Sequence, residues 1–201
     1  MVKLFLNFVL FIFLYVDFSF AKTIVFLGDS LTEGYGIEKE NAYPSIIAKK
    51  LDELFKGEHK IINSSISGST SASAKQRLVF LLKSKPDILV LALGANDGLR
   101  GVDINATYKN LEETIKLANK NQLKVLLCGV RVPPNYGKNY SDQFEKLFVQ
   151  LKEKHEIFFV PRILEGVAGR VDLNQEDGIH PNEKGHQIMA ETIWGELRKM
   201  L

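Results

Sequence analysis

The segment TIVFLGDSLTEGYG, residues Thr23 to Gly36, decides how the rest of the chain is interpreted. Its first four residues favour β structure, and the chain then passes through Leu27 and Gly28 and turns at Asp29 and Ser30. An apolar run that ends in a Gly-Asp-Ser cluster predicts a buried strand followed by a tight turn. If the strand lies in a parallel sheet, Ser30 lies at the carboxyl edge, where α/β folds place their sites. The alternative is that Asp29 or Ser30 only caps the next helix.

Length, composition and charge narrow the class of protein. The chain has 201 residues, of which 45% are hydrophobic and 25% are charged, so we expect one globular domain with a sizeable core. The formal net charge is only +2 and the lysines are dispersed between acidic residues, so no nucleic-acid partner is expected. Cys128 is the only cysteine, which excludes an intramolecular disulfide. Its context VLLCGV predicts a buried strand thiol.

The first residues have the pattern of a secretory signal peptide. Lys3 precedes an apolar run over Leu4–Tyr15, interrupted only by Asn7, and Ser19 and Ala21 are small residues three and one positions before a plausible cleavage site. We therefore predict a signal peptide at residues 1–21, a mature domain at residues 22–201, and a periplasmic or secreted protein. The alternative is an uncleaved membrane anchor, for which the apolar stretch is short.

Strand and helix signals alternate through the rest of the chain. After the first strand, apolar runs predict four more strands: Lys60–Asn63, Ile88–Leu93, Lys124–Val130 and Glu156–Val160. Helical spacing predicts five helices: Tyr43–Phe55, Ala74–Leu82, Tyr108–Asn119, Asp142–Lys154 and about Asn182–Met200. Strands that are apolar throughout indicate a parallel sheet covered on both faces. With right-handed crossovers, the prediction is a three-layer α/β/α sandwich around a five-stranded parallel sheet.

Three strand ends carry residues that suit acyl-transfer chemistry. The first gives Ser30, the second leads to Gly68, and the third gives Asn96 within the sequence GANDG. The missing side chain of Gly68 would let a backbone N–H approach a ligand, and Asn96 would offer an amide N–H to a developing oxyanion. Each has an ordinary alternative, since glycine makes loops flexible and Asn-Asp-Gly is a strong turn signal.

The segment DGIHP supplies a base and an acid. Asp177 and His180 are three residues apart, and Pro181 biases His180 away from helical geometry, so we expect the pair on a loop before the last helix. The other histidines lie in solvated or helical contexts without an acidic partner at a turn: His59, His155 and His186. A serine nucleophile needs a base, an acid that orients the base, and oxyanion donors, and this chain has each of them. The scattered histidines do not predict a metal site, and no G-x-G-x-x-G predicts a dinucleotide site.

These blocks, in this order, resemble the GDSL or SGNH hydrolase family: GDSL at residues 28–31, Gly68, GAND with Asn96, and DGIHP. The resemblance runs from Thr23 to the C-terminus and is greatest to the periplasmic multifunctional thioesterase, lysophospholipase and arylesterase subgroup. It implies a flavodoxin-like sandwich with no metal or organic cofactor. It also implies that Ser30 is the nucleophile, His180 the base and Asp177 its orienter. The oxyanion hole would consist of the Ser30 N–H, the Gly68 N–H and the Asn96 amide.

The chain also departs from the pattern of that family. Ser69 stands where similar members usually carry an acidic residue, and Ser73-Ala74 stand where many have glycines. Both changes lie near Gly68, so we expect the rim of the pocket to differ there while the catalytic set is whole.

The function expected from this resemblance is a serine esterase acting on small-molecule acyl esters or thioesters. The alternative enzyme is a carbohydrate acetylesterase, and the alternative from another class is a non-catalytic lipid- or glycan-binding domain. Transient contact with membrane lipids is expected as well, and the protein is expected to be a monomer.

Two segments are predicted to flank the opening above Ser30. They are Val132–Tyr140 and Pro161–Glu176, and we expect Tyr136, Leu164 and Val167 to contact the substrate. An acyl chain against them would gain about 0.8 kcal/mol for each buried methylene group. The alternative is that these side chains complete the core beneath the loops.

Overall fold

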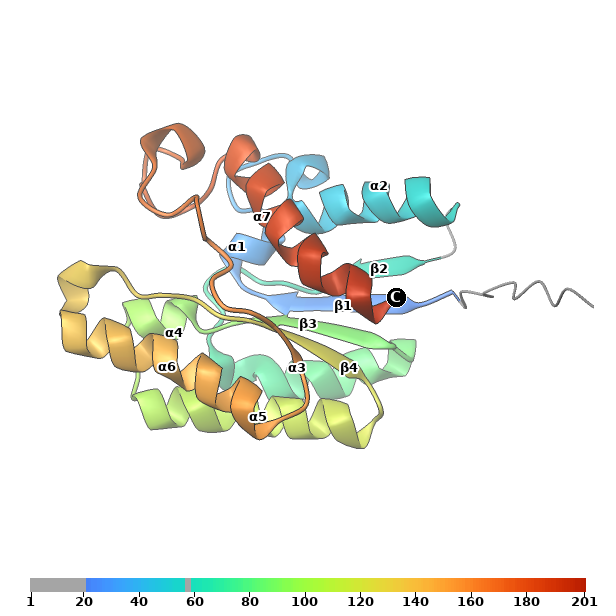
Figure 1. Cartoon of the computed structure of the whole chain (residues 1–201), viewed down its shortest axis with the longest axis horizontal. Helices are drawn as coiled ribbons and strands as arrows, with labels where there is room; N and C mark the ends of the chain where they lie inside the picture. Colours follow the sequence, from blue (N-terminus) through green and yellow to red (C-terminus); the bar gives the residue numbers. More distant parts are fainter. Residues whose placement is uncertain (1–20, 57–58) are drawn as a thin grey trace, which may run out of the picture.

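The computed structural model describes residues 21–56 and 59–201 (Figure 1). The predicted signal peptide, apart from Ala21, lies outside the described residues. Within these two ranges, no helix is long and apolar enough to cross a membrane.

The centre of the molecule is a sheet of five parallel strands, as predicted. The strands stand in the order β2-β1-β3-β4-β5. Their bounds are β1 (Thr23–Gly28), β2 (Lys60–Asn63), β3 (Ile88–Ala92), β4 (Lys124–Cys128) and β5 (Phe158–Val160). β1 pairs with β2 on one side and with β3 on the other, so the chain order reverses at β1. In such a sheet, the reversal opens a crevice at the carboxyl ends of the strands beside β1.

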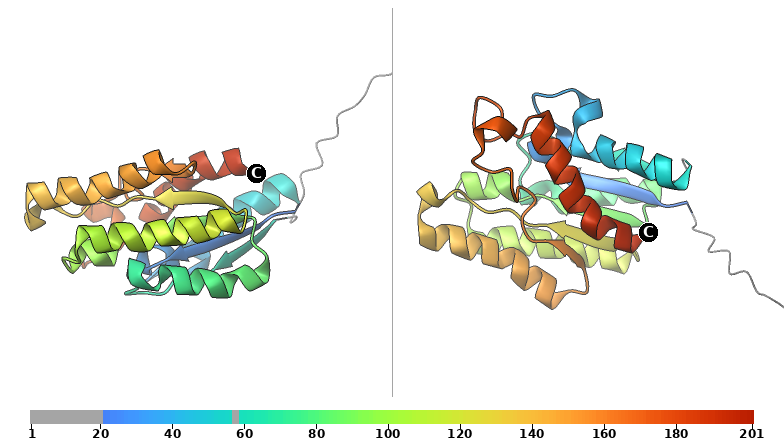
Figure 2. Two further views of the ribbon diagram at one scale, coloured as in Figure 1. Left: turned by 90° about the horizontal axis from the view of Figure 1, so that it is seen from below. Right: turned by 45° about the horizontal axis from the view of Figure 1, so that its top comes forward.

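Helices cover both faces of this sheet. The α-helices are α1 (Ser30–Glu33), α2 (Tyr43–Phe55), α3 (Ala74–Leu81), α4 (Ala95–Leu99), α5 (Ile104–Lys120), α6 (Lys138–Lys154) and α7 (Glu183–Leu197). The short 3-10 turns are Lys39–Asn41, Ser71–Ser73, Leu82–Ser84, Pro134–Tyr136, Val171–Leu173 and Arg198–Met200. Helices α2 and α7 lie on one face, and α3, α5 and α6 lie on the other (Figures 1 and 2). The predicted three-layer α/β/α sandwich is confirmed.

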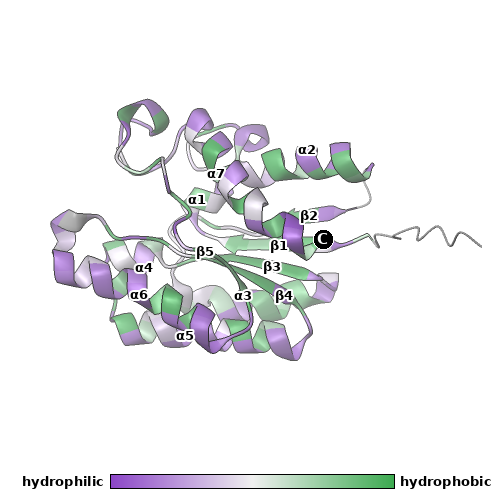
Figure 3. Ribbon diagram, viewed as in Figure 1, coloured by the Kyte–Doolittle hydropathy of each residue, from purple (hydrophilic) through white to green (hydrophobic). Residues whose placement is uncertain are grey.

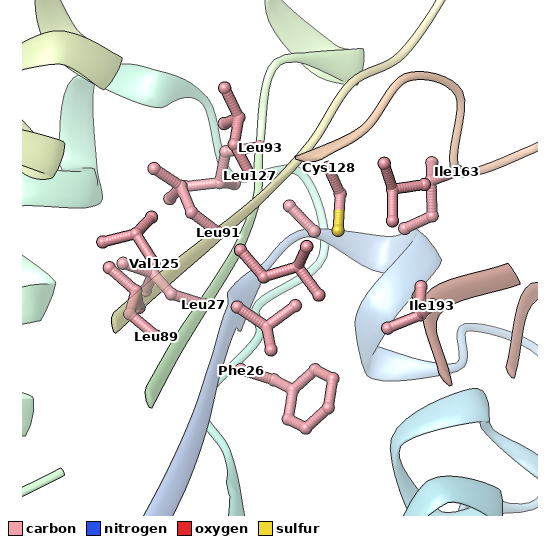
Figure 4. Packing of buried hydrophobic residues seen from close by; sticks show 14 of the residues in the cluster. Phe26, Leu27, Leu89, Leu91, Leu93, Val125, Leu127, Cys128, Ile163 and Ile193 are labelled. Carbon is pink, nitrogen blue, oxygen red and sulfur yellow. The ribbon is translucent and has the colours of Figure 1, made fainter. Parts of the chain in front are cut away.

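The core consists of strand side chains that alternate between the two helical layers. Phe26 lies on the side of α2, where its ring centroid is 5.8 Å from that of Tyr43. Leu27 and its in-register neighbour Leu91 point to the opposite layer, and both are 0% exposed. Figure 4 shows both groups, and Figure 3 shows that β1, β3 and β4 are mostly apolar. Cys128 is fully buried, as predicted, and burial raises the pKa of its thiol to about 12.

The start of α5 differs from the prediction. The helix begins at Ile104, whereas the apolar spacing predicts a start at Tyr108. Asp103 is the reason, because its Oδ1 accepts a hydrogen bond of 2.9 Å from the Ala106 N–H and caps the first turn. The first turn of this helix is therefore specified by a polar cap and not by periodicity.

The start of α6 and the whole of α4 also differ. Helix α6 begins at Lys138, four residues before the predicted Asp142, directly after Gly137 at φ +94°. The Gly137 carbonyl already accepts the first helical bond, from the Ser141 N–H at 3.0 Å. The Asn-Asp-Gly sequence, which signals a turn, lies instead inside the short helix α4.

One histidine has an acidic neighbour that was not expected. His155 Nε2 lies 3.5 Å from Glu112 Oε1. His186 lies in α7, a helical context as expected, but it is buried, and its Nδ1 accepts from the Tyr43 N–H at 3.2 Å. Burial lowers the pKa of His186 to about 4, so this imidazole is neutral and structural at neutral pH.

Candidate active site

The turn after β1 presents Ser30 at the carboxyl edge of the sheet. Asp29 is the cap of α1, because its Oδ1 accepts from the Leu31 N–H at 3.1 Å. Ser30 is the first residue of α1, where a backbone N–H has no acceptor within the helix. A Cβ on Gly28 would lie 2.2 Å from Thr32 Oγ1, so only glycine allows the turn to pack this closely. Asp29 thus takes the capping role, and the Ser30 hydroxyl is left for other contacts.

Ser30, His180 and Asp177 form a chain of hydrogen bonds. His180 Nε2 lies 3.0 Å from Ser30 Oγ, and His180 Nδ1 lies 2.6 Å from Asp177 Oδ2. The other carboxylate oxygen of Asp177 accepts from the Ile179 and His180 backbone N–H groups, each at 2.9 Å. These bonds, with the His180 backbone bond first, lower the pKa of Asp177 to about 2. Asp177 is therefore a carboxylate at any ordinary pH.

The ionisation of Asp177 fixes where the protons lie in the hydrogen bonds that join Asp177, His180 and Ser30. A carboxylate accepts hydrogen bonds and donates none, so His180 Nδ1 must carry the proton that lies between them. In a neutral imidazole, Nε2 is then the acceptor, and the Ser30 hydroxyl donates to it. This is the protonation state in which a histidine can remove the proton from a serine.

Gly68 lies on the loop after β2, and Asn96 lies in α4, where its side chain contacts Ser69, the residue that follows Gly68. Gly68 has φ +76°, which favours glycine, and its N–H donates no hydrogen bond to a residue in the described part of the chain. The Asn96 Nδ2 donates to Ser69 O at 3.1 Å, and Arg100 donates to Asn96 Oδ1 at 3.4 Å. These two contacts fix the orientation of the amide, because a guanidinium only donates and a carbonyl only accepts.

Two acidic residues that the sequence analysis did not single out hold the Gly68 loop. The buried Asp97 accepts from the Ser71 N–H at 2.9 Å and from the Ser71 hydroxyl at 2.5 Å. On the other side, Glu33 of α1 accepts from the Ser67 N–H at 2.7 Å and from its hydroxyl. The loop is thereby tied both to the segment of Asn96 and to the helix of Ser30.

Asp29 is a buried carboxyl group beside the nucleophile. It is 1% exposed, and its Oδ2 has no hydrogen-bond partner in residues 21–56 and 59–201. Burial raises the pKa of Asp29 to about 6, against the hydrogen bond from the Leu31 N–H, which lowers it.

Residues 21–56 and 59–201 hold no group of three or more His, Cys, Asp or Glu side chains that could bind a metal ion.

The prediction that Val167, in the segment Pro161–Glu176, contacts the substrate is wrong. Its side chain is 0% exposed, and Ile163 and Leu173 of the same segment are also buried in the core. The loop folds over the start of α7, where a Cβ on Gly185 would lie 3.1 Å from Val167 Cγ1. These side chains therefore complete the core, as the alternative interpretation proposed.

The two other predicted substrate contacts have different surroundings. Leu164 is half-buried against the core, whereas Tyr136 is exposed. Tyr140, at the end of the first predicted wall, is half-buried, and its hydroxyl donates to Gly98 O at 3.2 Å.

Three exposed apolar side chains lie on the loops that carry the site. Tyr35 follows the helix of Ser30, Ile66 precedes Gly68, and Ile179 directly precedes His180. They are 53%, 55% and 50% exposed, respectively. The sequence analysis did not single them out, although each is within a few residues of a motif that it named.

Comparisons with known proteins show the family and the fold of this chain. Residues 26–188 match the model of the GDSL-like lipase/acylhydrolase family. An arylesterase of Vibrio mimicus is 37% identical over 197 residues, which are 98% of each chain. Thioesterase 1/protease 1/lysophospholipase L1 of Escherichia coli (strain K12) is 31% identical over 182 residues, which cover 90% of this chain and 86% of the relative. The crystal structure of TesA superposes with a TM-score of 0.86 at 34% identity and covers 90% of this chain and 100% of that one.

Proposed function

The chain belongs to the GDSL-like lipase/acylhydrolase family and is an ester hydrolase, and we propose that Ser30 is the nucleophile with which it cleaves acyl esters and thioesters. The observation that carries this proposal is the continuous chain from Asp177 through His180 to Ser30, with links of 2.6 and 3.0 Å. A non-catalytic binding domain has no need of a carboxylate, an imidazole and a hydroxyl joined in this order.

In the first step, Ser30 Oγ attacks the acyl carbon while His180 Nε2 takes the hydroxyl proton. The electrons of the carbonyl double bond move to its oxygen, and the imidazolium is stabilised by the Asp177 carboxylate through Nδ1–H. Collapse of this intermediate breaks the C–O or C–S bond, and His180 gives its proton to the leaving group. A water molecule then repeats the sequence on the acyl-serine and releases the carboxylic acid.

The oxyanion of each intermediate is stabilised by the Ser30 N–H, the Gly68 N–H and the Asn96 amide. The N–H groups of Ser30 and Gly68 belong to the backbone. The Asn96 amide is held in one orientation by its hydrogen bonds with Ser69 and Arg100. Removal of one such donor typically lowers kcat by about 100- to 1000-fold.

The substrate is a small-molecule ester or thioester whose apolar part lies over the exposed rim of the site. Ile66 and Ile179 supply that rim, and we assign Tyr136 and Leu164 a secondary contact with longer chains. The names of the relatives, an arylesterase and a thioesterase 1/lysophospholipase L1, support this substrate class. The enzyme acts as a monomer and contacts membrane lipids transiently.

The enzyme is exported to the periplasm or secreted after removal of residues 1–21. Support comes from Lys3, the apolar run that follows it and the small residues at Ser19 and Ala21. In addition, the first strand begins at Thr23, so cleavage before Lys22 removes no residue of the sheet.

A hydrolysis panel tests the proposed function. The purified enzyme is assayed on p-nitrophenyl esters, acyl-CoA, lysophospholipid and acetylated sugar, in parallel with Ser30→Ala. We expect turnover of the first three substrates, and a loss of about four orders of magnitude or more in the variant. Turnover of acetylated sugar alone would favour the carbohydrate-esterase alternative, and full activity of a folded Ser30→Ala protein would exclude the serine mechanism.

A further inference from the structure

His180 itself lies outside the helices and strands of the described structure. His180 lies on the loop between Asp177 and α7, and its contacts with Asp177 span only three residues. Those contacts fix the imidazole within its own loop. They do not fix the distance between that loop and the turn that carries Ser30.

Gln175 joins the two segments. Its side-chain Nε2 donates to Tyr35 O at 2.7 Å and to Pro181 O at 3.0 Å, while its backbone N–H donates to His180 O at 2.8 Å. One amide group thus uses its two donors on two carbonyls that are 146 residues apart in the sequence, one on the segment that follows the helix of Ser30 and one on the residue that follows His180. Gly36 makes room for this amide, because a Cβ there would lie 2.1 Å from Gln175 Oε1.

Tyr35 completes the link on the side of the nucleophile. Its backbone N–H donates to Ser30 O at 3.1 Å, and its ring centroid lies 4.7 Å from that of His180, with the planes at 43°. The ring is 53% exposed, so core packing does not account for its place. The backbone of Tyr35 is therefore hydrogen-bonded to the backbone of Ser30, and its ring packs against the imidazole of His180.

We propose that Tyr35 and Gln175 are positioning residues that set the distance and the ring orientation of His180 relative to Ser30. This proposal rests on the serine mechanism proposed above. The ring of Tyr35 limits the rotation of the imidazole, and the amide of Gln175 holds the two loops at one separation. A displacement of about 1 Å between reacting groups is sufficient to lower a catalytic rate by about 100-fold.

Gln175→Glu is the sharpest perturbation of this link. It keeps the size of the side chain but replaces two donors with an oxygen that faces two carbonyl oxygens, so attraction becomes repulsion. We expect kcat on a p-nitrophenyl ester to fall by about 10- to 100-fold, with KM within about twofold of the wild-type value. Gln150→Glu, on the exposed side of α6, is the matched control for the added charge.

A second pair of variants tests the ring and does not depend on the stability of Gln175→Glu. Tyr35→Ala keeps the backbone bonds but removes the ring, and we expect kcat to fall by about tenfold or more. Tyr35→Phe, which keeps the ring, should rescue most of this loss. Equal activity of the Ala and Phe variants at the wild-type level would overturn the role of the ring.

A double-mutant cycle with His180→Ala distinguishes positioning from a structural role. If Gln175 acts through His180, Gln175→Glu has no further effect on the residual hydrolysis once the imidazole is absent. An equal fractional loss in both backgrounds would overturn the proposal, as would wild-type kcat in a folded Gln175→Glu enzyme. Ser30→Ala is measured in the same assay. If Ser30→Ala retains activity, the serine mechanism itself is refuted. If Ser30→Ala is inactive but Gln175→Glu has the wild-type kcat, only the positioning role is refuted.

Discussion

The buried carboxyl group of Asp29 should make a contribution to the stability of the enzyme that is lost as the pH rises. Asp29 is 1% exposed, and burial raises its pKa from 3.8 to about 6. At about 1.4 kcal/mol for each pH unit, this difference corresponds to about 3 kcal/mol between the protonated and ionised forms of the folded state. Replacement of Asp29 by Asn removes the ionisation, while the amide oxygen still accepts from the Leu31 N–H.

The sign and the pH window follow from proton linkage. Below about pH 4, Asp29 is protonated in both the folded and the unfolded state, and its contribution to the stability of the folded protein is fully present. Between about pH 4 and pH 6 the unfolded chain releases this proton before the folded protein does, so the contribution of Asp29 to the free energy of unfolding decreases as the pH rises. Above about pH 6 the decrease is complete.

Urea denaturation of the wild type and Asp29→Asn at about pH 4, 5, 6 and 7 measures this effect. The difference in unfolding free energy, variant minus wild type, should increase by about 2–3 kcal/mol across the series. Any change in unfolding free energy that comes from repacking around the substituted side chain in the variant is the same at each pH, so it does not affect the increase across the series. Asp52→Asn, on the exposed side of α2, controls for the loss of one negative charge. A difference that stays level from pH 4 to pH 7 would refute the reasoning.

Asp177→Asn should lower kcat by about 10⁴-fold in a folded protein, whereas the exposed Asp172→Asn should not; a reversal in the steady-state rates would place the orienting acid elsewhere. Since hydrogen bonds hold the pKa of Asp177 at about 2, the wild-type rate should show no step from this carboxyl group above about pH 4. Val167→Ala should reduce the unfolding free energy by about 1–2 kcal/mol without altering acyl-chain preference; a changed chain-length profile would return Val167 to the substrate site. Intact-mass measurement of the exported enzyme should show residue 22 as the first residue, and a mass that retains residues 1–21 would indicate an anchor.

Local patterns in the sequence are sufficient to predict the sheet and the residues that meet at its edge. Strands that are apolar throughout indicate a sheet between two layers, and parallel strands bring their carboxyl ends together. For that reason, the order of the strand signals alone assigns Ser30, Gly68 and Asn96 to one edge. His180 differs from the other histidines because Asp177 and Pro181 flank it within the same turn.

The remaining features depend on distances that a single sequence does not contain. Val167 lies in the core and Tyr136 is exposed, yet both occur in loops with similar apolar content. Gln175 contacts Tyr35 across 140 residues, so no local pattern marks either of them. Asp97 follows Asn96 in a sequence that signals a turn, and only the packed structure shows that it anchors the Gly68 loop.

The most direct test of the central claim is covalent labelling of the nucleophile. The purified enzyme is treated with a fluorophosphonate, digested and analysed by mass spectrometry, with Ser30→Ala and His180→Ala treated in parallel. We predict one adduct on the peptide that contains Ser30, none in Ser30→Ala, and strongly slowed labelling in His180→Ala. An enzyme that hydrolyses esters but carries the adduct on another residue, or remains unlabelled at Ser30, would contradict this account.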